Sequence, residues 1–589
     1  MAEAPAPDRA PALKARPLLG SETAFGDDLP PWLRRIYAAR AATPDALDLQ
    51  LGWIPPATGL RGIEAALALL IDALERQSRL LIVGDFDADG ATSTALAVLG
   101  LRALGFAQVD FLVPNRFEYG YGLTPEIVAL ARTRKPDLII TVDNGISSIA
   151  GVAAARDAGI RVLVTDHHLP GRVLPAADAI VNPNQPECGF PHKALAGVGV
   201  MFYLLAALRG RLKADNWFAR QGIPEPAMAD WLDLVALGTV ADVVPLDRLN
   251  RTLVHQGLRR IRAGRCRPGV LALLEVAGRD HRHAVAADLG FTVGPRLNAA
   301  GRLDDISLGI RCLLADDIAM ARALAAQLDE LNRDRRAIEA QMQREATAHV
   351  ARLRLGEDLP WGLCLYDPGW HQGVVGLLAG RVRERVHRPV IAFADGNNGE
   401  LKGSARSIPG LHIRDALDAV AARYPDLIGR FGGHAAAAGL ALAAENFAAF
   451  ATAFDAVVRE WLAPTDLELE ILHDGEVPAA ELTLENAHRL RAAGPWGQHF
   501  PEPCFHGEFR VRDARVVGAT HLKLMLSPLT DDRLLDAIAF NAVAAEGKPQ
   551  LPERIRIVYR LDVNRFRGAE SLQLLIEHIL GSAGGVCRG

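Results

Sequence analysis

A short apolar run that ends in three closely spaced acids constrains this chain more than any other feature. Residues Leu80–Val83 are typical of a strand buried on both faces, and Asp85, Asp87 and Asp89 follow at alternate positions. In an extended backbone such side chains share one face, so we expect the three carboxylates to converge. Converging anions repel one another and are costly to bury unless a cation neutralises them. The segment therefore predicts a divalent metal site, with a solvated acidic turn as the alternative.

Three later segments repeat this pattern of an apolar strand that ends in polar residues. Helical patterns separate the segments, which indicates a parallel sheet with right-handed crossovers. Ligands of such sheets bind outside the carboxyl ends of the strands, so we expect the polar residues to meet there. The segments are Asp110–Pro114 followed by Asn115 and Arg116, Leu138–Val142 followed by Asp143, and Arg161–Thr165 followed by Asp166, His167 and His168.

A fourth contribution comes from the largely apolar stretch of residues 232–245. Asp242 stands near the end of this stretch, among residues that should be buried, and is a further candidate for the same edge of the sheet. A cap or a turn acid before Pro245 is the alternative role for Asp242. We expect Asp233, near the start of the stretch, to be a helix-surface or capping residue.

These motifs resemble those of a known superfamily. Asp85–Gly90, Asp143–Gly145, Asp166–His168 and Gly238–Asp242 resemble the first four motifs of the DHH phosphoesterase superfamily. The resemblance runs from about residue 51 to about residue 580 and its motifs are specific. Six further segments resemble the RecJ family of bacterial single-strand-specific exonucleases, namely Pro114–Phe117, Gly294–Arg302, Trp370–Gly376, Gly403–Ser407, Gly432–His434 and Tyr559–Asn564.

The resemblance implies an α/β protein in which a long helix joins a parallel-sheet domain to a smaller α/β domain and a β-barrel follows. The sequence agrees, because residues 317–355 almost lack Gly and Pro and short alternating segments follow residue 462. We expect a tightly packed helix at residues 435–438. The implied division is an N-terminal segment 1–60 with a disordered start, a DHH catalytic domain 61–315, a connecting helix 316–360, a DHHA1 substrate-binding domain 361–461 and an OB-fold 462–589. The Ala- and Pro-rich composition predicts that the disordered start extends to about Pro17.

The resemblance also assigns roles to residues at matching positions. Carboxylates with one imidazole suit Mn²⁺ or Mg²⁺ better than zinc, so we expect two divalent ions, with Mn²⁺ preferred. The implied metal ligands are Asp87, Asp89, Asp143 as the bridge, His167 and Asp242. Asp85 is implied as a supporting acid, with a direct ligand role as the alternative, Asp166 as the residue that orients a neighbouring ligand, and His168 as hydrogen-bond donor or general acid at the scissile phosphate. The implied substrate contacts are Arg116, Arg296, Arg302, Ser404 and Arg406 to the 5′-terminal phosphate and His434 to the nucleic-acid backbone.

For each of these arginines the alternative is an ordinary surface or salt-bridged residue, most strongly for Arg302. Arg296 and Arg302 flank a Gly/Ala-rich segment that we expect to be a turn, and we expect Ser404 and Arg406 to lie on a loop between the lobes. In the barrel, Lys523, Arg560, Arg565, Phe566 and Arg567 are candidates for a single-strand track.

The implied function is 5′→3′ degradation of single-stranded DNA to 5′-mononucleotides by two-metal-ion hydrolysis, in DNA repair and recombination. A helicase and a single-strand-binding protein are the expected partners, and we expect a monomer. Two alternatives remain open: a phosphodiesterase of short oligonucleotides or cyclic dinucleotides, and a non-catalytic DNA-binding scaffold. The apparent barrel argues against the first, since a tiny substrate needs no extended track. The intact ligand set argues against the second.

The amino-acid composition constrains the cellular compartment and the mode of DNA binding more than it constrains the reaction. A formal net charge of −5 argues against general electrostatic coating of DNA, so affinity must come from local basic tracks and from metal ions. Six cysteines without C-x-x-C spacing favour neither a zinc site nor a disulfide framework, which is typical of a reducing cytoplasm. The longest apolar runs fall short of the roughly 20 residues of a membrane helix, and no signal peptide is evident, so we expect a cytoplasmic protein without a membrane anchor.

Overall fold

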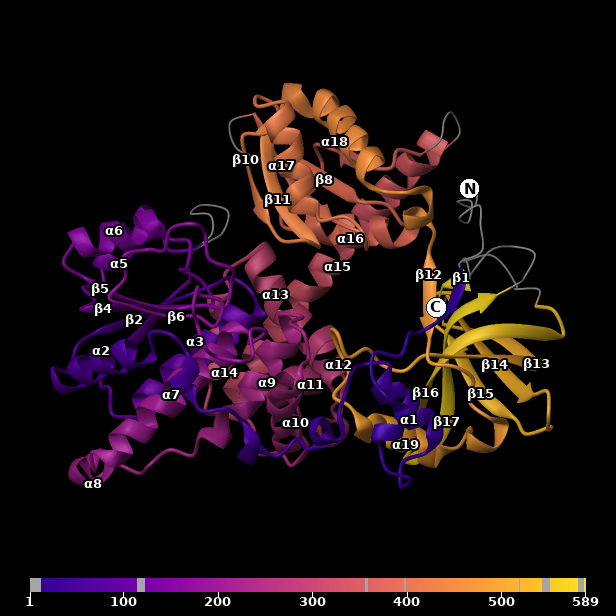
Figure 1. Ribbon diagram of the computed structural model, residues 1–589, viewed down its shortest axis with the longest axis horizontal. Helices are drawn as coiled ribbons and strands as arrows, with labels where there is room; N and C mark the ends of the chain where they lie inside the picture. Colours follow the sequence, from indigo (N-terminus) through magenta and orange to yellow (C-terminus); the bar gives the residue numbers. More distant parts are fainter. Residues whose placement is uncertain are drawn as a thin grey trace.

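The computed structural model describes residues 12–113, 122–354, 359–396, 399–518, 520–542, 551–580 and 587–588. Three lobes are visible in Figure 1: a parallel-sheet lobe on the left, a smaller lobe above and a barrel on the right. The long helix α15 runs from the centre of the molecule into the upper lobe (Figure 1). No helix of the described ranges combines the length and apolar character that a membrane crossing requires.

The first lobe is built on the expected parallel sheet, with strand order β3-β2-β4-β5-β6. Alternate residues of β2 face opposite sides, because Leu80 and Ile82 belong to the core under α2, α3 and α7, whereas Leu81 and Val83 pack with α5 and α6. The strands are β2 (Leu80–Gly84), β3 (Val109–Leu112), β4 (Leu138–Val142), β5 (Arg161–Thr165) and β6 (Ala179–Val181). The helices are α2 (Ile63–Glu75), α3 (Ala88–Ala103), α5 (Pro125–Arg132), α6 (Ile149–Asp157), α7 (Gly197–Ala214) and α8 (Trp217–Gln221).

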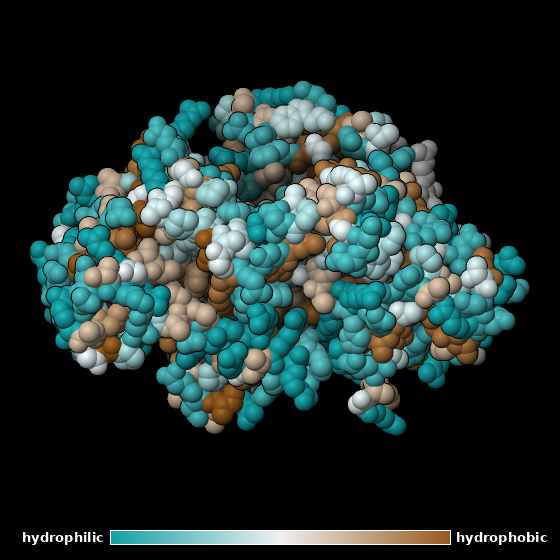
Figure 2. All heavy atoms as spheres, turned by 60° about the horizontal axis from the view of Figure 1, so that its bottom comes forward, coloured by the Kyte–Doolittle hydropathy of each residue, from teal (hydrophilic) through white to brown (hydrophobic). Residues whose placement is uncertain are grey.

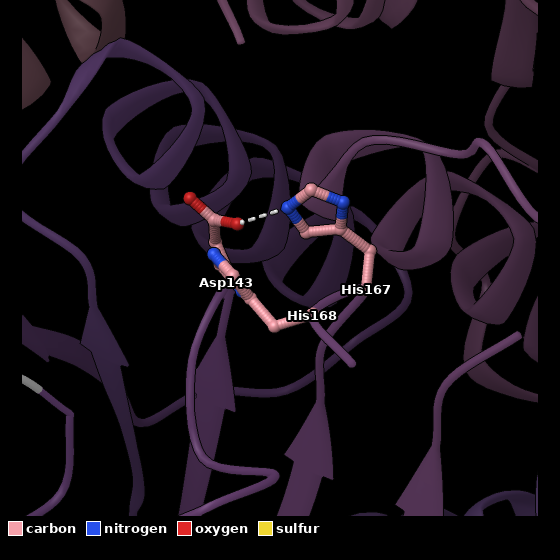
Figure 3. Close-up of side chains that lie close together, drawn as sticks. All are labelled: Asp143, His167 and His168. Carbon is pink, nitrogen blue, oxygen red and sulfur yellow. Dashed lines mark ion pairs between the residues drawn. The ribbon is translucent and has the colours of Figure 1, made fainter. Parts of the chain in front are cut away.

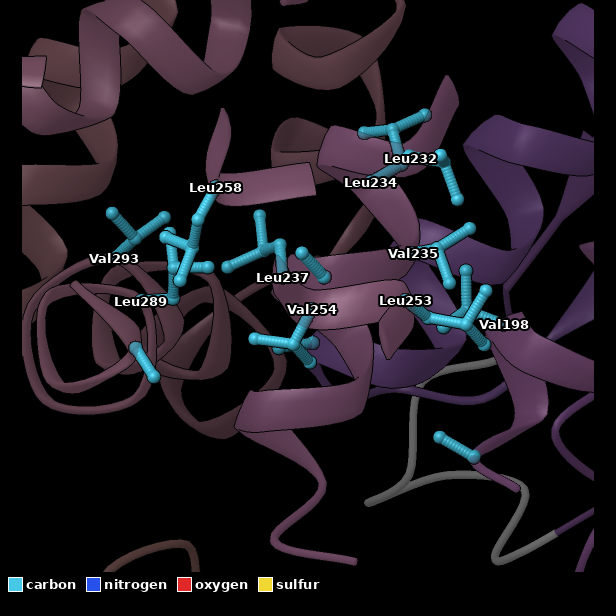
Figure 4. Packing of buried hydrophobic residues seen from close by; sticks show 14 of the residues in the cluster. Val198, Leu232, Leu234, Val235, Leu237, Leu253, Val254, Leu258, Leu289 and Val293 are labelled. Atoms are coloured by element: carbon cyan, nitrogen blue, oxygen red, sulfur yellow. The ribbon is translucent and has the colours of Figure 1, made fainter. Parts of the chain in front are cut away.

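A helical layer continues this lobe toward the centre of the molecule. Its core is formed by leucines and valines of α9 and α10 that pack on Leu289 and Val293 (Figure 4). Asp233 lies in this core with no exposed surface, so the expectation of a helix-surface residue was wrong. The elements are α9 (Leu232–Ala241), α10 (Arg248–Arg262), α11 (Pro268–Val276), α12 (Ala286–Asp288), the π-helix η7 (Leu289–Val293), α13 (Gly294–Leu303) and α14 (Ser307–Leu314).

Helix α15 (Ile318–Arg354) is a single unbroken helix of 37 residues that joins the two lobes. Ion pairs join the middle of this helix to both lobes, because Asp329 forms a buried pair with Arg296 of α13 and Glu339 pairs with the half-exposed Arg381 of the upper lobe. Trp370 also donates a hydrogen bond from Nε1 to Glu345 of α15. The helix therefore acts as a rigid connection between the lobes.

The upper lobe holds a five-stranded sheet of order β10-β11-β9-β8-β7. The expected helix at residues 435–438 was wrong: a turn leads into β11, whose small residues pair antiparallel with β9 in a regular ladder. The elements are β7 (Leu363–Tyr366), α16 (Val375–Val386), β8 (Val390–Asp395), β9 (Glu400–Arg406), α17 (Ile413–Arg423), β10 (Arg430–Gly433), β11 (Ala437–Ala443) and α18 (Phe447–Trp461).

The third lobe is a closed barrel, because β15 pairs with β17 in addition to β14 and so completes the ring. The barrel confirms the prediction from the alternating segments that follow residue 462. The strands are β13 (Phe505–Val517), β14 (His521–Pro528), β15 (Leu535–Ala539), β16 (Arg554–Phe566) and β17 (Ala569–Leu580), with β18 (Cys587–Arg588) at the edge and α19 (Leu484–Ala493) beside them.

The N-terminal segment crosses the molecule and packs against the barrel side (Figure 1). Strand β1 (Ala12–Ala15) pairs in parallel with β12 (Glu470–His473), and α1 (Pro31–Ala38) follows it. Disorder was expected up to about Pro17. For residues 12–17 that was wrong, because a distant strand supplies the hydrogen bonds that the local sequence does not signal. The start of the predicted segment lies outside the described residues.

Candidate metal centre

The acids and histidines singled out from the sequence meet at the carboxyl edge of the first sheet. They come from three strand ends and from the C-terminus of α9, where Asp242 is the capping residue. Three groups have ligand atoms within 4.8 Å of one another, and the groups share Asp143 or His167: Asp143 with His167 and His168, Asp89 with His167 and Asp242, and Asp85 with Asp87 and Asp143.

The route by which the first three acids converge differs from the expectation of an extended segment. Asp87 is the N-cap of α3 and its Oδ1 accepts a hydrogen bond from Gly90 N at 3.0 Å. Asp89 already lies in the first turn of that helix. The convergence therefore arises from a tight strand-to-helix turn. A Cβ at Gly90 would lie 2.4 Å from the Asp85 carbonyl oxygen, so the turn requires glycine.

His167 faces two carboxylates through the same ring nitrogen. Its Nε2 lies 3.1 Å from Asp143 Oδ1 and 3.5 Å from Asp242 Oδ2 (Figure 3 shows the first contact). Burial and the charge of His168 lower the pKa of His167 to about 4, so its ring is neutral at pH 7. Among the described residues, neither His167 Nε2 nor Asp242 Oδ2 has a hydrogen-bond partner. A neutral imidazole lone pair that faces carboxylate oxygens is an arrangement that a cation would complete.

The carboxylates of the cluster are buried beside one another. Burial and the charge of Asp87 raise the pKa of Asp89 to about 7, although its two oxygens accept hydrogen bonds from Gly197 N and Val198 N at the start of α7. Burial and neighbouring carboxylates also raise the pKa values of Asp143 and Asp242. This concentration of negative charge fits divalent cations held by oxygen ligands and one imidazole.

Asp143 itself is held in an uncommon backbone conformation with φ +61°. The N-terminus of α7 approaches it so closely that a Cβ at Gly197 would lie 2.6 Å from the Asp143 Cβ. Val243, directly after Asp242, also has a positive φ of +62°. Asp tolerates this conformation better than most residues, but it strains the β-branched Val243, and such strain concentrates at functional sites.

Asp166 organises the loop that carries both histidines. Its Oδ1 accepts hydrogen bonds from His168 Nδ1 at 2.7 Å and from the backbone nitrogens of His167 and His168. Burial lowers the pKa of His168, but the hydrogen bond and charge of Asp166 outweigh it and the pKa is raised to about 9. His168 is therefore protonated at neutral pH. Its ring stacks on the ring of His434 from the upper lobe, with centroids 6.2 Å apart.

Ser404 and Arg406 lie on strand β9, not on a loop as expected, because β9 pairs with both β8 and β11. Arg406 donates hydrogen bonds from one nitrogen to Ser404 Oγ at 3.1 Å and to the Ala405 carbonyl. A Cβ at Gly376, near the N-terminus of α16, would lie within 3 Å of both side chains. The strand thus presents this pair directly under the start of a helix.

The two arginines of the Gly/Ala-rich segment lie on helix α13 and not on a turn. Arg296 is 7% exposed, and its guanidinium pairs with Asp329 of α15 and donates to the Thr292 carbonyl. This corresponds to the salt-bridged alternative, so the structure does not bring Arg296 to the cluster. Arg302 donates to the Gly373 carbonyl of the upper lobe at 3.1 Å. Arg116 lies outside the described residues.

One residue of this region was missed. Asn298 Oδ1 accepts a hydrogen bond from Ala88 N at 2.8 Å, between two of the candidate ligands. A Cβ at Gly301 would lie only 1.9 Å from the Phe86 carbonyl oxygen. Helix α13 is therefore seated against the loop that carries Asp87 and Asp89. Asn298 stands inside the segment Gly294–Arg302, but only arginines in that segment were considered as functional residues.

The basic candidates of the barrel are mostly neutralised by neighbouring acids. Lys523 pairs with Asp536, Arg560 with Glu577 and Arg565 with Glu570. Phe566 remains 64% exposed, and the guanidinium of Arg567 lies 5.1 Å from its ring centroid. The surface in Figure 2 is largely hydrophilic, with a hollow below the upper lobe.

The comparisons with known proteins agree on one family. Family models match residues 79–239 (DHH family, N-terminal domain), 356–460 (DHHA1 domain) and 473–578 (RecJ OB domain). The chain is 56% identical over 569 residues to the single-stranded-DNA-specific exonuclease RecJ of Dickeya dadantii, covering 96% of this chain and 98% of that one. It is 55% identical to the exonuclease of the same name from Escherichia coli, covering 94% and 96%.

Solved structures agree with the sequence relatives. The crystal structure of RecJ in complex with Mn²⁺ from Thermus thermophilus matches with a TM-score of 0.78 and 31% identity, covering 98% of this chain and 80% of that one. The crystal structure of the Mg²⁺ complex from the same organism matches with a TM-score of 0.72 and 30% identity, covering 97% and 78%.

Proposed function

Because the chain belongs to the RecJ family of single-stranded-DNA-specific exonucleases, we propose that it degrades DNA stepwise from the 5′ end and releases 5′-mononucleotides. It is a metal-dependent nuclease that acts on single-stranded DNA. The observation that carries the proposal is the cluster of carboxylates and histidines at the sheet edge, in which the ligand atoms of each group lie within 4.8 Å of one another and Asp143 belongs to two groups. The domain division given by the sequence stays part of the proposal.

The proposed cofactors are two divalent ions, Mn²⁺ in preference to Mg²⁺. Asp143 would bridge them, with Asp87 and Asp85 on one side and Asp89, His167 and Asp242 on the other. When bound, such ions supply stabilisation of phosphate charge and a more acidic water. RecJ from Thermus thermophilus has been solved with Mn²⁺ and with Mg²⁺, which supports both ions as candidate cofactors.

His168 is the proposed proton donor at the scissile phosphate. It keeps a proton at neutral pH because Asp166 accepts from Nδ1, and this hydrogen bond also fixes the direction of the ring. Its ring lies against His434, which we propose to contact the DNA backbone. Asp166 acts through His168 and the histidine loop and not on the substrate itself.

Recognition of the 5′ phosphate is assigned to the upper lobe. Arg406 and Ser404 lie together beneath the start of α16, where helix N–H groups and a guanidinium both favour an anion. Arg302 lies at the contact between the lobes and is the proposed second arginine, with Arg116 as a third. Arg296 is instead proposed to position α13 through Asp329.

The test of the proposed function is digestion of an end-labelled single strand with Mn²⁺, compared with the same strand annealed to its complement. We expect mononucleotides from the 5′ end of the single strand and little product from the duplex. Arg406→Ala should slow cleavage of a 5′-phosphorylated strand more than that of a 5′-hydroxyl strand, whereas the exposed control Arg430→Ala should change neither. Equal slowing of both strands, or of neither, would contradict the role in end recognition.

We also propose that a helicase and a single-strand-binding protein supply the substrate during DNA repair and recombination, and that the chain acts as a cytoplasmic monomer. Cys188, Cys266, Cys312, Cys364 and Cys504 of the described structure are free thiols. Free thiols are typical of a reducing compartment. Sedimentation of the purified protein with and without a single-strand-binding protein would test the oligomeric state and the partner together.

A further inference from the structure

The segment between the barrel contact and the metal loop contains a π-helix, and its sequence explains why. Pro295 has no N–H to donate to the carbonyl of Phe291, so the regular α-helical ladder cannot continue through this point. Instead Gly294 N donates to the Leu289 carbonyl, five residues back. Short π-helices interrupt helices at an energetic cost and occur frequently at functional sites.

The π-helix fixes Phe291 in solvent. Leu289 and Val293 have no exposed surface and pack with α9 and α10 (Figure 4), while Phe291 between them is 81% exposed. This is the highest exposure among the large apolar side chains of the described residues. Single exposed apolar residues are common, so exposure alone assigns nothing. Here, however, both flanking residues are anchored, and the ring is therefore presented at a defined position.

The backbone on either side of Phe291 packs on the helix that carries a candidate metal ligand. A Cβ at Gly290 would lie 3.0 Å from Val240 Cγ1, and one at Gly294 would lie 3.2 Å from Ala241 Cβ. The π-helix thus packs on the last turn of α9, which ends at the candidate ligand Asp242. Val243, the next residue, is strained and 61% exposed.

The same segment also reaches the barrel side. Arg491 of α19 donates to the His283 carbonyl at 2.6 Å, and α12 follows on the side of the molecule that faces the barrel (Figure 1). Fifteen residues after His283, Asn298 accepts from Ala88 N of the metal loop. Phe291 therefore stands about halfway along a segment that runs from the barrel contact to the metal ligands.

From this placement we propose that Phe291 is a stacking platform for a base of the single strand on its way from the barrel to the metal centre. The inference rests on the proposed function and adds a binding subsite to it. Bases of a single strand have free faces that can stack on an aromatic ring, and every base can do so, whereas bases within a duplex are already stacked on their neighbours. The site therefore favours unpaired strands without selecting a sequence.

The experiment compares wild type with Phe291→Ala and Phe291→Trp, using phosphorothioate single strands that resist cleavage and carry 2-aminopurine at successive positions. We expect wild type and Phe291→Trp to quench the fluorescence at one internal position, and Phe291→Ala to lose this quenching. Affinity for the long strand should fall roughly 10-fold to 100-fold in Phe291→Ala. Tyr424→Ala, which removes an exposed aromatic side chain of the upper lobe, should behave as wild type.

Hydrolysis of a trinucleotide, which has only one base beyond the two that flank the first scissile bond, separates this role from a structural one. We expect Phe291→Ala to hydrolyse it within about 2-fold of the wild-type rate. Unchanged quenching and unchanged long-strand affinity in Phe291→Ala would overturn the proposal, and so would an equal loss of trinucleotide hydrolysis. If wild type itself fails to degrade ordinary single strands, the proposed exonuclease function fails, whereas a defect confined to Phe291→Ala supports the platform.

Discussion

Two buried carboxylate sites in this molecule differ in how their charge is compensated. At the junction of the N-terminal segment and the barrel, Asp474 is held by Arg40 through both oxygens, at 2.7 and 3.0 Å, and by Arg16 at 3.3 Å. Cys504 N donates to the same carboxylate. Each oxygen of Asp474 thus has a cationic partner inside the protein.

At the metal centre, by contrast, several carboxylates lie close together beside the neutral ring of His167, and the protonated ring of His168 pairs with Asp166. Burial and mutual repulsion raise the pKa values of Asp89, Asp143 and Asp242, and the neutral ring of His167 adds no charge to offset them. Burial of charge is common to both sites, so burial alone does not indicate function. The crowding of several carboxylates into one site does, because a bound cation relieves their mutual repulsion.

The largest expected effect comes from the metal centre. Asp143→Asn should lower nuclease activity by on the order of 10³-fold or more, because Asp143 belongs to two of the three donor groups. In chelator, the same variant should be at least as heat-stable as wild type, since one of several repelling carboxylates is gone. Nuclease rates and thermal unfolding with and without Mn²⁺ check both expectations.

The matched control is Asp137→Asn at the opposite end of the same strand, where the carboxylate is half exposed and accepts from Arg79 N. It should leave the nuclease rate and the Mn²⁺-induced rise in melting temperature unchanged. If Asp143→Asn were less heat-stable than wild type in chelator, the Asp143 carboxylate would stabilise the fold as Asp474 does. The proposed difference between the two sites would then be wrong.

The compensated site should respond in stability and not in catalysis. Arg40→Met leaves Asp474 buried without its main partner and should destabilise the N-terminal junction by about 3–5 kcal/mol. Adding Asp474→Asn should recover part of this loss, because the amide can still accept from Cys504 N. Hydrogen exchange of β1 and β12 measures the effect. Lys14→Met, which removes an exposed pair with Glu470 on the same two strands, should cost less than about 1 kcal/mol.

The metal centre could be predicted from the sequence because its members follow strands of one parallel sheet. The strand ends at Asp85, Asp143 and Asp166 fix a common edge, whatever the details of each turn. The local geometry could not be predicted in the same way: Asp87 and Asp89 enter a helix, and an extended backbone was expected. The fold of residues 435–438 was also missed, because an alanine run carries no period and pairing with β9 decides its conformation.

Long-range contacts account for the other gaps. The strand at residues 12–15 forms by pairing with β12. The two strands are more than 450 residues apart in the sequence, so no local pattern predicts the pairing. The ion pair of Arg296 with Asp329 and the hydrogen bond from Ala88 N to Asn298 likewise join separate segments. No local pattern distinguishes an arginine that will pair with a helix from one that will bind phosphate. Asp474 and Arg40 carried no signal for the same reason.

The smallest expected effect concerns Asp233, a buried carboxylate that is less well compensated than Asp474 but does not belong to the metal centre. Its Oδ2 accepts from Arg267 N at 2.6 Å, but burial raises its pKa to about 6 and no side-chain cation pairs with it in the described structure. Because the folded state then holds the proton more tightly than the unfolded state, the free energy of unfolding should fall as pH rises from about 4 to about 6. Relative to Asp233→Asn, the fall should be about 3 kcal/mol. Hydrogen exchange of α9 across this pH range measures it, and taking the difference from the variant removes the titration of the metal centre. The exposed control Asp230→Asn should show no such trend, and a difference between wild type and Asp233→Asn that is constant with pH would place Asp233 with the compensated sites.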